Sequence, residues 1–154
     1  MRRNSARRLL VVLTLITALA GAAFGAQQKT KGKSLYDRLG GKKAITAVVD
    51  EFVGRVAADS RINAFFKDTA ADPKRLAKFK SNLVDQICEA SGGTCKYKGK
   101  DMKTAHAGMG ITDANFTALV EDLTAALDQF KVGEMEKQQL LGALGPMKKD
   151  IVTK

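Results

Sequence analysis

Apolar residues recur at three- and four-residue steps over most of the chain, the spacing that places side chains on one face of a helix. The first long example spans residues 42–57 and contains Ile45, Val48, Val49, Phe52, Val53 and Val56. A second helix is predicted to begin with Asp72 as N-cap and Pro73 at its first position, and to end before Ser91. Its apolar face comprises Leu76, Phe79, Leu83, Val84, Ile87 and Cys88.

Two further long helices are predicted in the second half of the chain. Thr112 or Asp113 caps the first, whose apolar positions are Phe116, Leu119, Val120, Leu123, Leu127 and Phe130. The last begins near Gly133, is bent by Pro146, and carries Met135, Leu140, Leu141, Leu144, Met147 and Ile151. No segment alternates convincingly with a period of two, so the predicted fold class is all-α.

Shorter elements join these helices. In "SLYDRLGG" (34–41), Ser34 and Asp37 have capping-box spacing and a glycine pair follows, which predicts a short helix and a turn. A second short helix is predicted around His106, after a glycine-rich loop. The segment containing "RINAFFKDT" is interpreted as a connection.

The first 25 residues differ from the rest of the chain. A basic start, "MRRNSARR", precedes an apolar run of 16 residues and then small residues. The run is shorter than the roughly 20 residues of a membrane-spanning helix, and its flanks are typical of an export signal. We therefore predict a leader over residues 1–25, cleaved after Gly25, Ala23 or Ala26, a linker over 26–33, and one domain over 34–154 without a stable membrane span.

Composition adds limits on partners and compartment. Removal of the leader lowers the formal charge from +10 to +6, and the lysines are scattered among acids without interleaved aromatic residues, so nucleic acid is not an expected partner. Export, to the periplasm, would bring Cys88 and Cys95 into an oxidising compartment. A disulfide is then favoured, with two unlinked thiols as the alternative.

His106 is the only histidine in the chain, so it has no second imidazole as a partner. It is either a surface or core-edge residue without a ligand, or a ligand of a metal or a haem iron, since a haem needs only one protein ligand on one side. Zinc would need three or four donors, which the chain does not offer.

Several motifs resemble the truncated haemoglobins of group 1. They are the two double-glycine turns, the paired phenylalanines of "VVDEFVGRVAADSRINAFF" (48–66), and "KYKGKDMKTAHAGMGIT" (96–112), and the similarity covers residues 34–153. The resemblance implies a two-over-two helical globin that binds haem b through His106 as the proximal iron ligand. It also implies that oxygen, nitric oxide or carbon monoxide is the partner of the iron, with a reductant that the sequence does not identify.

The resemblance also places other residues around the porphyrin, all of which are compatible with ordinary core positions. These are Phe52, Phe65, Phe66, Phe79, Leu83, Ile87, Ile111 and Leu119, with Tyr97 and Met102 flanking the macrocycle. Thr69, Lys78 and Lys80 are candidates for the propionates, although at least one lysine is better explained as a surface residue.

The chain departs from the family on the distal side. Many members have a tyrosine after the phenylalanine at Phe52, and its hydroxyl donates to bound oxygen, whereas this chain has Val53. Phe79 and Leu83 are also apolar, which leaves Asn82 and Gln86 as possible donors. Since distal donors decide between binding and activation, this departure weakens the inference of nitric oxide dioxygenase activity and leaves enzymatic activity open. A lysine such as Lys80 as sixth ligand is a minor alternative, because it would have to lose its proton.

The sequence therefore predicts an exported haem protein that reversibly binds a diatomic gas. Two alternatives stay open: a periplasmic copper-binding helical protein that uses Met102, His106 and Met109, and a helical interaction module without a cofactor.

Overall fold

The computed structural model describes residues 32–154, and this part of the chain is helical with no strand in it. The long helices are α2 (Gly41–Ala58), α4 (Pro73–Ala90), α6 (Asp113–Gln129) and α7 (Glu134–Leu144). The short elements are α1 (Leu35–Arg38), η1 (Asn63–Phe66), α3 (Lys67–Ala70), α5 (Met102–His106), η2 (Gly145–Met147) and α8 (Lys148–Ile151). The leader and most of the linker predicted from the sequence lie outside the described residues.

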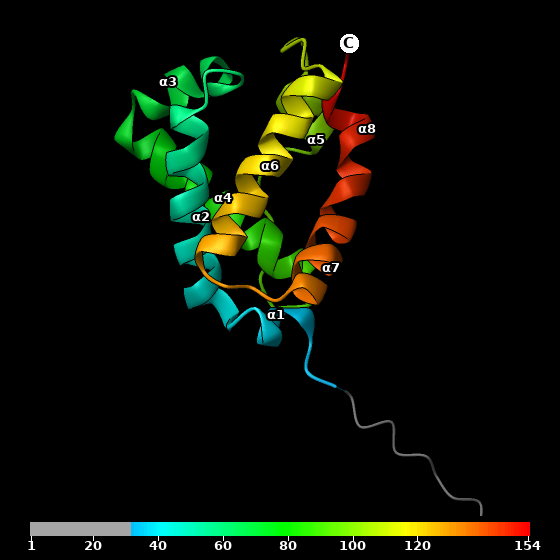
Figure 1. Ribbon diagram of the computed structural model, residues 1–154. Helices are drawn as coiled ribbons and strands as arrows, with labels where there is room; N and C mark the ends of the chain where they lie inside the picture. Colours follow the sequence, from blue (N-terminus) through cyan, green and yellow to red (C-terminus); the bar gives the residue numbers. More distant parts are fainter. Residues whose placement is uncertain (1–31) are drawn as a thin grey trace, which may run out of the picture. The chain divides into compact units, whose positions relative to one another are not determined.

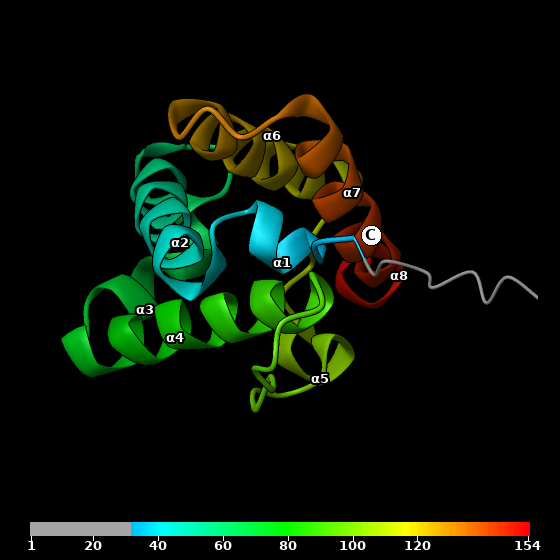
Figure 2. The ribbon, with the colours of Figure 1, turned by 90° about the horizontal axis from the view of Figure 1, so that it is seen from below.

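The four long helices form one packed unit. α2 packs against both α4 and α6, and α7 contacts α4 and α6 in turn. Figures 1 and 2 show these helices around a common interior, with α1 across one end. This is the arrangement expected from the sequence, with two helices over two.

The helix starts follow from local capping, as the sequence predicted. The Ser34 hydroxyl accepts from the Asp37 amide at 3.1 Å, and the Asp37 carboxylate accepts from the Ser34 amide at 3.1 Å. Asp72 accepts from the amides of Lys74 and Arg75 at the start of α4. Thr112 and Asn115 make the same reciprocal pair at the start of α6.

The predicted apolar faces form the core. Val49, Cys88, Ala126, Leu127 and Leu140 are essentially inaccessible to solvent, and they come from all four long helices. Burial of such faces supplies most of the stability of helices of this length, because an isolated helix is marginal in water.

Two residues assigned to apolar faces are outside the core. Phe130 is 46% exposed and Met135 is 65% exposed. α6 ends at Gln129, one residue before Phe130, and Lys131 adopts a φ of 55°. The chain therefore leaves the helix at Phe130, and this side chain does not continue the buried face of α6. Met135 lies in the first turn of α7, beside that turn.

The segment interpreted as a connection contains two further helical turns, η1 and α3. η1 contains Phe65 and Phe66, both half-buried, and the Phe66 ring lies next to that of Phe79 on α4, while α3 packs against α4. Each is only four residues long, too short for a periodic pattern to reveal. Within residues 32–154 no helix combines the length and the apolar character needed to cross a bilayer.

Candidate functional site

His106 is the last residue of α5 and is half-buried. Its Nδ1 atom lies 2.7 Å from the carbonyl oxygen of Met102, one helical turn earlier. A carbonyl can only accept, so Nδ1 carries the proton and donates, which leaves the lone pair on Nε2. This fixes the ring orientation and the tautomer in the form in which imidazole binds a metal through Nε2.

The loop before α5 is ordered by Tyr97. Its hydroxyl donates to the carbonyl oxygen of Lys100 at 2.8 Å, and its ring lies so close to Gly99 that a Cβ there would approach the ring to within 3 Å. Burial raises the pKa of the Tyr97 phenol, as does the charge of Asp101, so the donor stays protonated. Asp101 then caps α5 by accepting from the Thr104 amide. Hydrogen bonds from the Thr104 side chain, and then from its backbone, lower the pKa of the Asp101 carboxyl.

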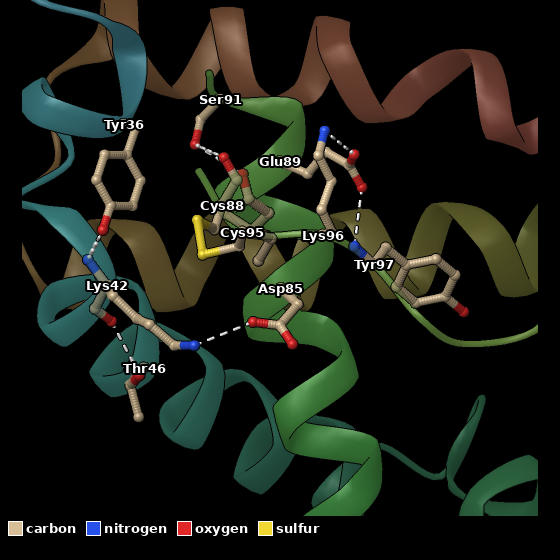
Figure 3. The surroundings of a disulfide bond; sticks show 11 residues. Tyr36, Lys42, Thr46, Asp85, Cys88, Glu89, Ser91, Cys95, Lys96 and Tyr97 are labelled. Atoms are coloured by element: carbon tan, nitrogen blue, oxygen red, sulfur yellow. Dashed lines mark hydrogen bonds and ion pairs between the residues drawn. A yellow bond between two sulfur atoms is a disulfide. The ribbon is translucent and has the colours of Figure 1, made fainter. Parts of the chain in front are cut away.

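A disulfide between Cys88 and Cys95 holds the start of this loop against the last turn of α4 (Figure 3). The sequence favoured this bond, and the structure confirms it, with the two Cα atoms 5.8 Å apart. Glu89 adds two contacts beside it, because its carboxylate accepts from the Tyr97 amide and from the Lys96 ammonium, each at 2.9 Å. The bond from Tyr97, and then that from Lys96, lower the pKa of Glu89.

The second glycine pair is explained by two different requirements. Gly92 has a φ of 88°, which favours glycine. At Gly93 the reason is close packing, since a Cβ there would lie 2.6 Å from the Cys88 sulfur and 2.7 Å from the Tyr36 ring. Only a residue without a side chain lets the loop turn back over the disulfide.

Reduction of the disulfide is expected to lower the free energy of unfolding. Closing so short a loop stabilises by about 2–3 kcal/mol in the chain-entropy model. Urea unfolding of the haem-loaded protein, oxidised against reduced and at fixed haem concentration, measures the difference. The matched control is the double variant Cys88→Ala/Cys95→Ala, whose midpoint should not respond to reductant. An unchanged wild-type midpoint after complete reduction would contradict the expectation.

On the other side of His106 the chain turns through two glycines and is anchored by the C-terminus. Gly108 and Gly110 have φ values of 76° and 66°. The carbonyl of buried Ile111 then accepts from the amides of Thr153 and Lys154. We call residues 95–111 the histidine segment. One end of this segment is bonded to α4 by the disulfide, and the other end is hydrogen-bonded to Thr153 and Lys154, which follow α8.

The predicted porphyrin contacts outside this segment gather on α2, η1, α4 and α6. Phe52 and Ile87 are buried in the core, and the half-buried side chains packed against that core include Val53, Phe65, Phe66, Leu83 and Leu119. Phe79 joins them through Phe66, with ring centroids 5.6 Å apart. These residues lie in or against one core, and we call them the apolar wall. Tyr97, Met102, His106 and Ile111 belong to the histidine segment.

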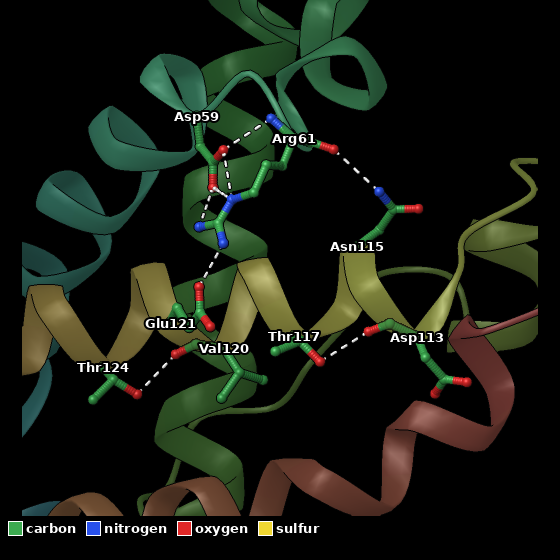
Figure 4. A network of polar contacts seen from close by, with 8 residues as sticks. All are labelled: Asp59, Arg61, Asp113, Asn115, Thr117, Val120, Glu121 and Thr124. Carbon is green, nitrogen blue, oxygen red and sulfur yellow. Dashed lines mark hydrogen bonds and ion pairs between the residues drawn. The ribbon is translucent and has the colours of Figure 1, made fainter.

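A polar network fixes the corner from which η1 departs (Figure 4). Arg61 pairs with Asp59 at 2.7 Å and with Glu121 of α6 at 2.6 Å. The Arg61 carbonyl accepts from the Asn115 side chain at 3.1 Å. The Arg61 guanidinium lowers the pKa of Asp59. These contacts with α6 fix the start of η1, whose Phe65 and Phe66 pack against the core.

Gln86 links the wall to the histidine segment, a role that the sequence did not indicate. Its amide donates to the sulfurs of Met102 and Met147, at 3.5 and 3.2 Å. No periodicity or motif marks such a contact between three elements. Of the two donors considered for the distal side, Gln86 is thus occupied by sulfur, and Asn82 is half-buried without a hydrogen bond from its side chain to the described residues.

The Lys80 side chain forms an ion pair between α2 and α4. Its ammonium donates to Asp50 at 2.8 Å, and both residues line a groove of about 310 Å³ between these helices. This ion pair works against Lys80 as a sixth iron ligand. Among residues 32–154 there is also no cluster of three or more His, Cys, Asp or Glu side chains suited to a metal ion.

These residues fit a haem. One imidazole nitrogen is free and oriented, and Phe65, Phe66, Phe79 and Leu83 on other elements are large apolar side chains only partly covered by protein. Apolar walls with a single nitrogen donor suit a planar, largely apolar cofactor that needs one axial ligand. Fold and site together define a helical haem-binding protein.

Comparison with known proteins defines the family. The model of the bacterial-like globins matches residues 34–153. A group 1 truncated haemoglobin of Mycolicibacterium paratuberculosis is 34% identical over 126 residues, covering 82% of this chain and 89% of the relative. The crystal structure of the Tetrahymena pyriformis truncated haemoglobin superposes with a TM-score of 0.73 at 31% identity, covering 79% of this chain and all of that one.

A two-over-two haemoglobin from Synechococcus, solved with covalently attached haem, has a TM-score of 0.71 and 33% identity over 79% of this chain and all of its own. The chain belongs to the bacterial-like globins, as a group 1 truncated haemoglobin. Its cofactor is haem, and as a globin it binds gas ligands. The comparisons do not favour the copper-binding alternative or a module without a cofactor.

Proposed function

We propose that the Nε2 atom of His106 holds the haem iron as the single proximal ligand, and that the protein reversibly binds oxygen or nitric oxide. The observation that carries the proposal is the hydrogen bond from Nδ1 to the Met102 carbonyl, which leaves Nε2 as the acceptor. Bound haem supplies the iron that takes the gas.

The residues of the chain have separate tasks in this proposal. The Met102 carbonyl orients the imidazole and makes it more basic by accepting a hydrogen bond from its Nδ1–H group. Phe52, Val53, Phe79 and Leu83 exclude water from the distal side, which protects ferrous iron from oxidation. Thr69 and Lys78, the latter exposed and without an ion pair to the described residues, are the candidates for the propionates, since Lys80 is paired with Asp50.

Absorption spectra of the purified protein test this function. We expect one haem per chain, a five-coordinate ferrous spectrum, and reversible shifts of the Soret band with oxygen and carbon monoxide. Absence of a Soret band, with copper bound in its place, would replace the haem proposal by copper binding.

We also propose that the protein is exported to the periplasm. The basic and apolar pattern of residues 1–25 supports this, as does the disulfide, because such bonds persist in oxidising compartments. Cell fractionation should recover protein that begins near Ala26 and has no reactive thiol after denaturation. Cytoplasmic protein that begins at Met1 would contradict export.

A further inference from the structure

Four lysines occur within eight residues just before the histidine: Lys96, Lys98, Lys100 and Lys103. Lys96 pairs with Glu89. The other three are exposed and make no ion pair with the described part of the chain. Lys103 lies on α5 itself, three residues from His106.

The C-terminal end of the chain brings another lysine to this place. α8 packs against α5, and the Lys154 side chain lies against Gly110, four residues after His106. Lys154 is exposed. We call Lys98, Lys100, Lys103 and Lys154 the lysine face.

Two of the acids nearby are paired with other lysines, Glu89 with Lys96 and Asp113 with Lys148. Asp101, which accepts from the Thr104 amide, and half-buried Asp150 form no ion pair within residues 32–154. The four lysines of the face outnumber these two acids, so the lysine face is positively charged and attracts acidic surfaces.

The loop that carries these lysines is held in place. The disulfide, the Glu89 contacts and the Tyr97 hydroxyl fix its course from residue 95 to residue 100. A fixed charge pattern loses less entropy on docking than a mobile one, and it sets the orientation of an encounter complex.

We propose that the lysine face docks an acidic one-electron donor protein, which reduces the haem iron. The inference rests on the proposed function, since oxygen binds ferrous and not ferric iron. The step would transfer one electron from the reduced centre of the donor protein to the haem iron. The donor would be oxidised and ferric iron reduced to ferrous, with no covalent bond formed or broken. Docking beside His106 places the donor at the segment that holds the iron.

The probe is a reduced acidic plant-type [2Fe–2S] ferredoxin, mixed in stopped flow with the ferric haem-loaded protein. At about 10 mM salt the Debye length is near 30 Å, so steering is strong, whereas at about 0.15 M it is near 8 Å. We expect the second-order rate constant to fall about tenfold or more over this range.

The decisive variant is Lys98→Glu/Lys100→Glu/Lys103→Glu. At low salt it should reduce the rate constant about tenfold or more, and the gap to wild type should shrink at high salt. The matched control is Lys43→Glu/Lys67→Glu/Lys74→Glu, which changes net charge equally at exposed lysines on α2, α3 and α4, and which should keep most of the rate. Calorimetric binding of the oxidised ferredoxin to each protein at low salt is a second readout that needs no electron transfer.

The haem spectrum separates this proposal from the one on which it rests. Wild-type protein without a Soret band would refute the haem function itself. With haem bound, equal rates for both variants, whether slowed or unchanged, would overturn the lysine face as a docking surface. If the glutamate variant does not hold haem, Lys98→Gln/Lys100→Gln/Lys103→Gln replaces it, with an expected fall of about threefold, and an unchanged rate there would likewise overturn the proposal.

Discussion

Replacement of His106 by alanine is expected to abolish stable haem incorporation. His106 is the only histidine in the chain, so no other imidazole is available to hold the iron. The variant keeps the apolar wall but loses the Nε2 donor, together with the hydrogen bond to the Met102 carbonyl that orients the ring. Haem content after gel filtration, together with the ferrous spectrum, measures the effect.

Two companion variants sharpen this experiment. Lys103→Ala changes an exposed residue of the same short helix and should keep one haem per chain. His106→Gly should regain a five-coordinate ferrous spectrum when free imidazole is added, because the small molecule can occupy the space of the side chain. A normal five-coordinate ferrous spectrum of His106→Ala without imidazole would show that the proximal assignment is wrong.

Val53→Tyr is expected to slow oxygen dissociation by roughly one to two orders of magnitude. Oxygen acquires partial negative charge when it binds ferrous iron, and a hydroxyl donor in a water-poor pocket stabilises it by about 1–3 kcal/mol. Each 1.4 kcal/mol is a factor of about ten in the equilibrium constant. Carbon monoxide is nearly apolar, so its dissociation should barely change. Stopped-flow dissociation of both gases from wild type and variant measures this.

The geometry around Val53 supports the choice of this position. Val53 is a half-buried residue of α2 at the edge of the core, so a larger ring there does not have to fit into the closed interior. Gln86, the other polar candidate, already donates to two sulfurs, which leaves Asn82 as the side chain best able to supply a native donor. An apolar distal side therefore predicts fast release of oxygen by the wild type.

The matched control is Val53→Phe, which adds nearly the same volume without the hydroxyl. Only the tyrosine should slow oxygen selectively. If phenylalanine slows oxygen as much, the effect is steric. A slow wild-type rate that tyrosine leaves unchanged would mean that Asn82 or a water molecule already donates, and the apolar interpretation of the pocket would be wrong.

The sequence by itself determined the elements whose causes are local. Caps at Ser34, Asp72 and Thr112 satisfy amides within the next three residues, and Pro146 interrupts the last helix whatever surrounds it. The motif around His106 gave the family and the cofactor, because few residue patterns combine Tyr-x-Gly with Asp-Met-x-x-x-His.

Only the tertiary structure decided the features that depend on residues distant in the chain. Gly93 is required because a Cβ there would lie 2.6 Å from the Cys88 sulfur and 2.7 Å from the ring of Tyr36, a residue of the distant helix α1. The Gln86 amide donates to the sulfurs of Met102 and Met147, and the Lys80 ammonium donates to Asp50. These partners lie on other elements of the fold, so the sequence pattern of α4 does not reveal them. Phe130 and Met135 stayed exposed because burial depends on what packs against a face, whereas periodicity records only that a face exists.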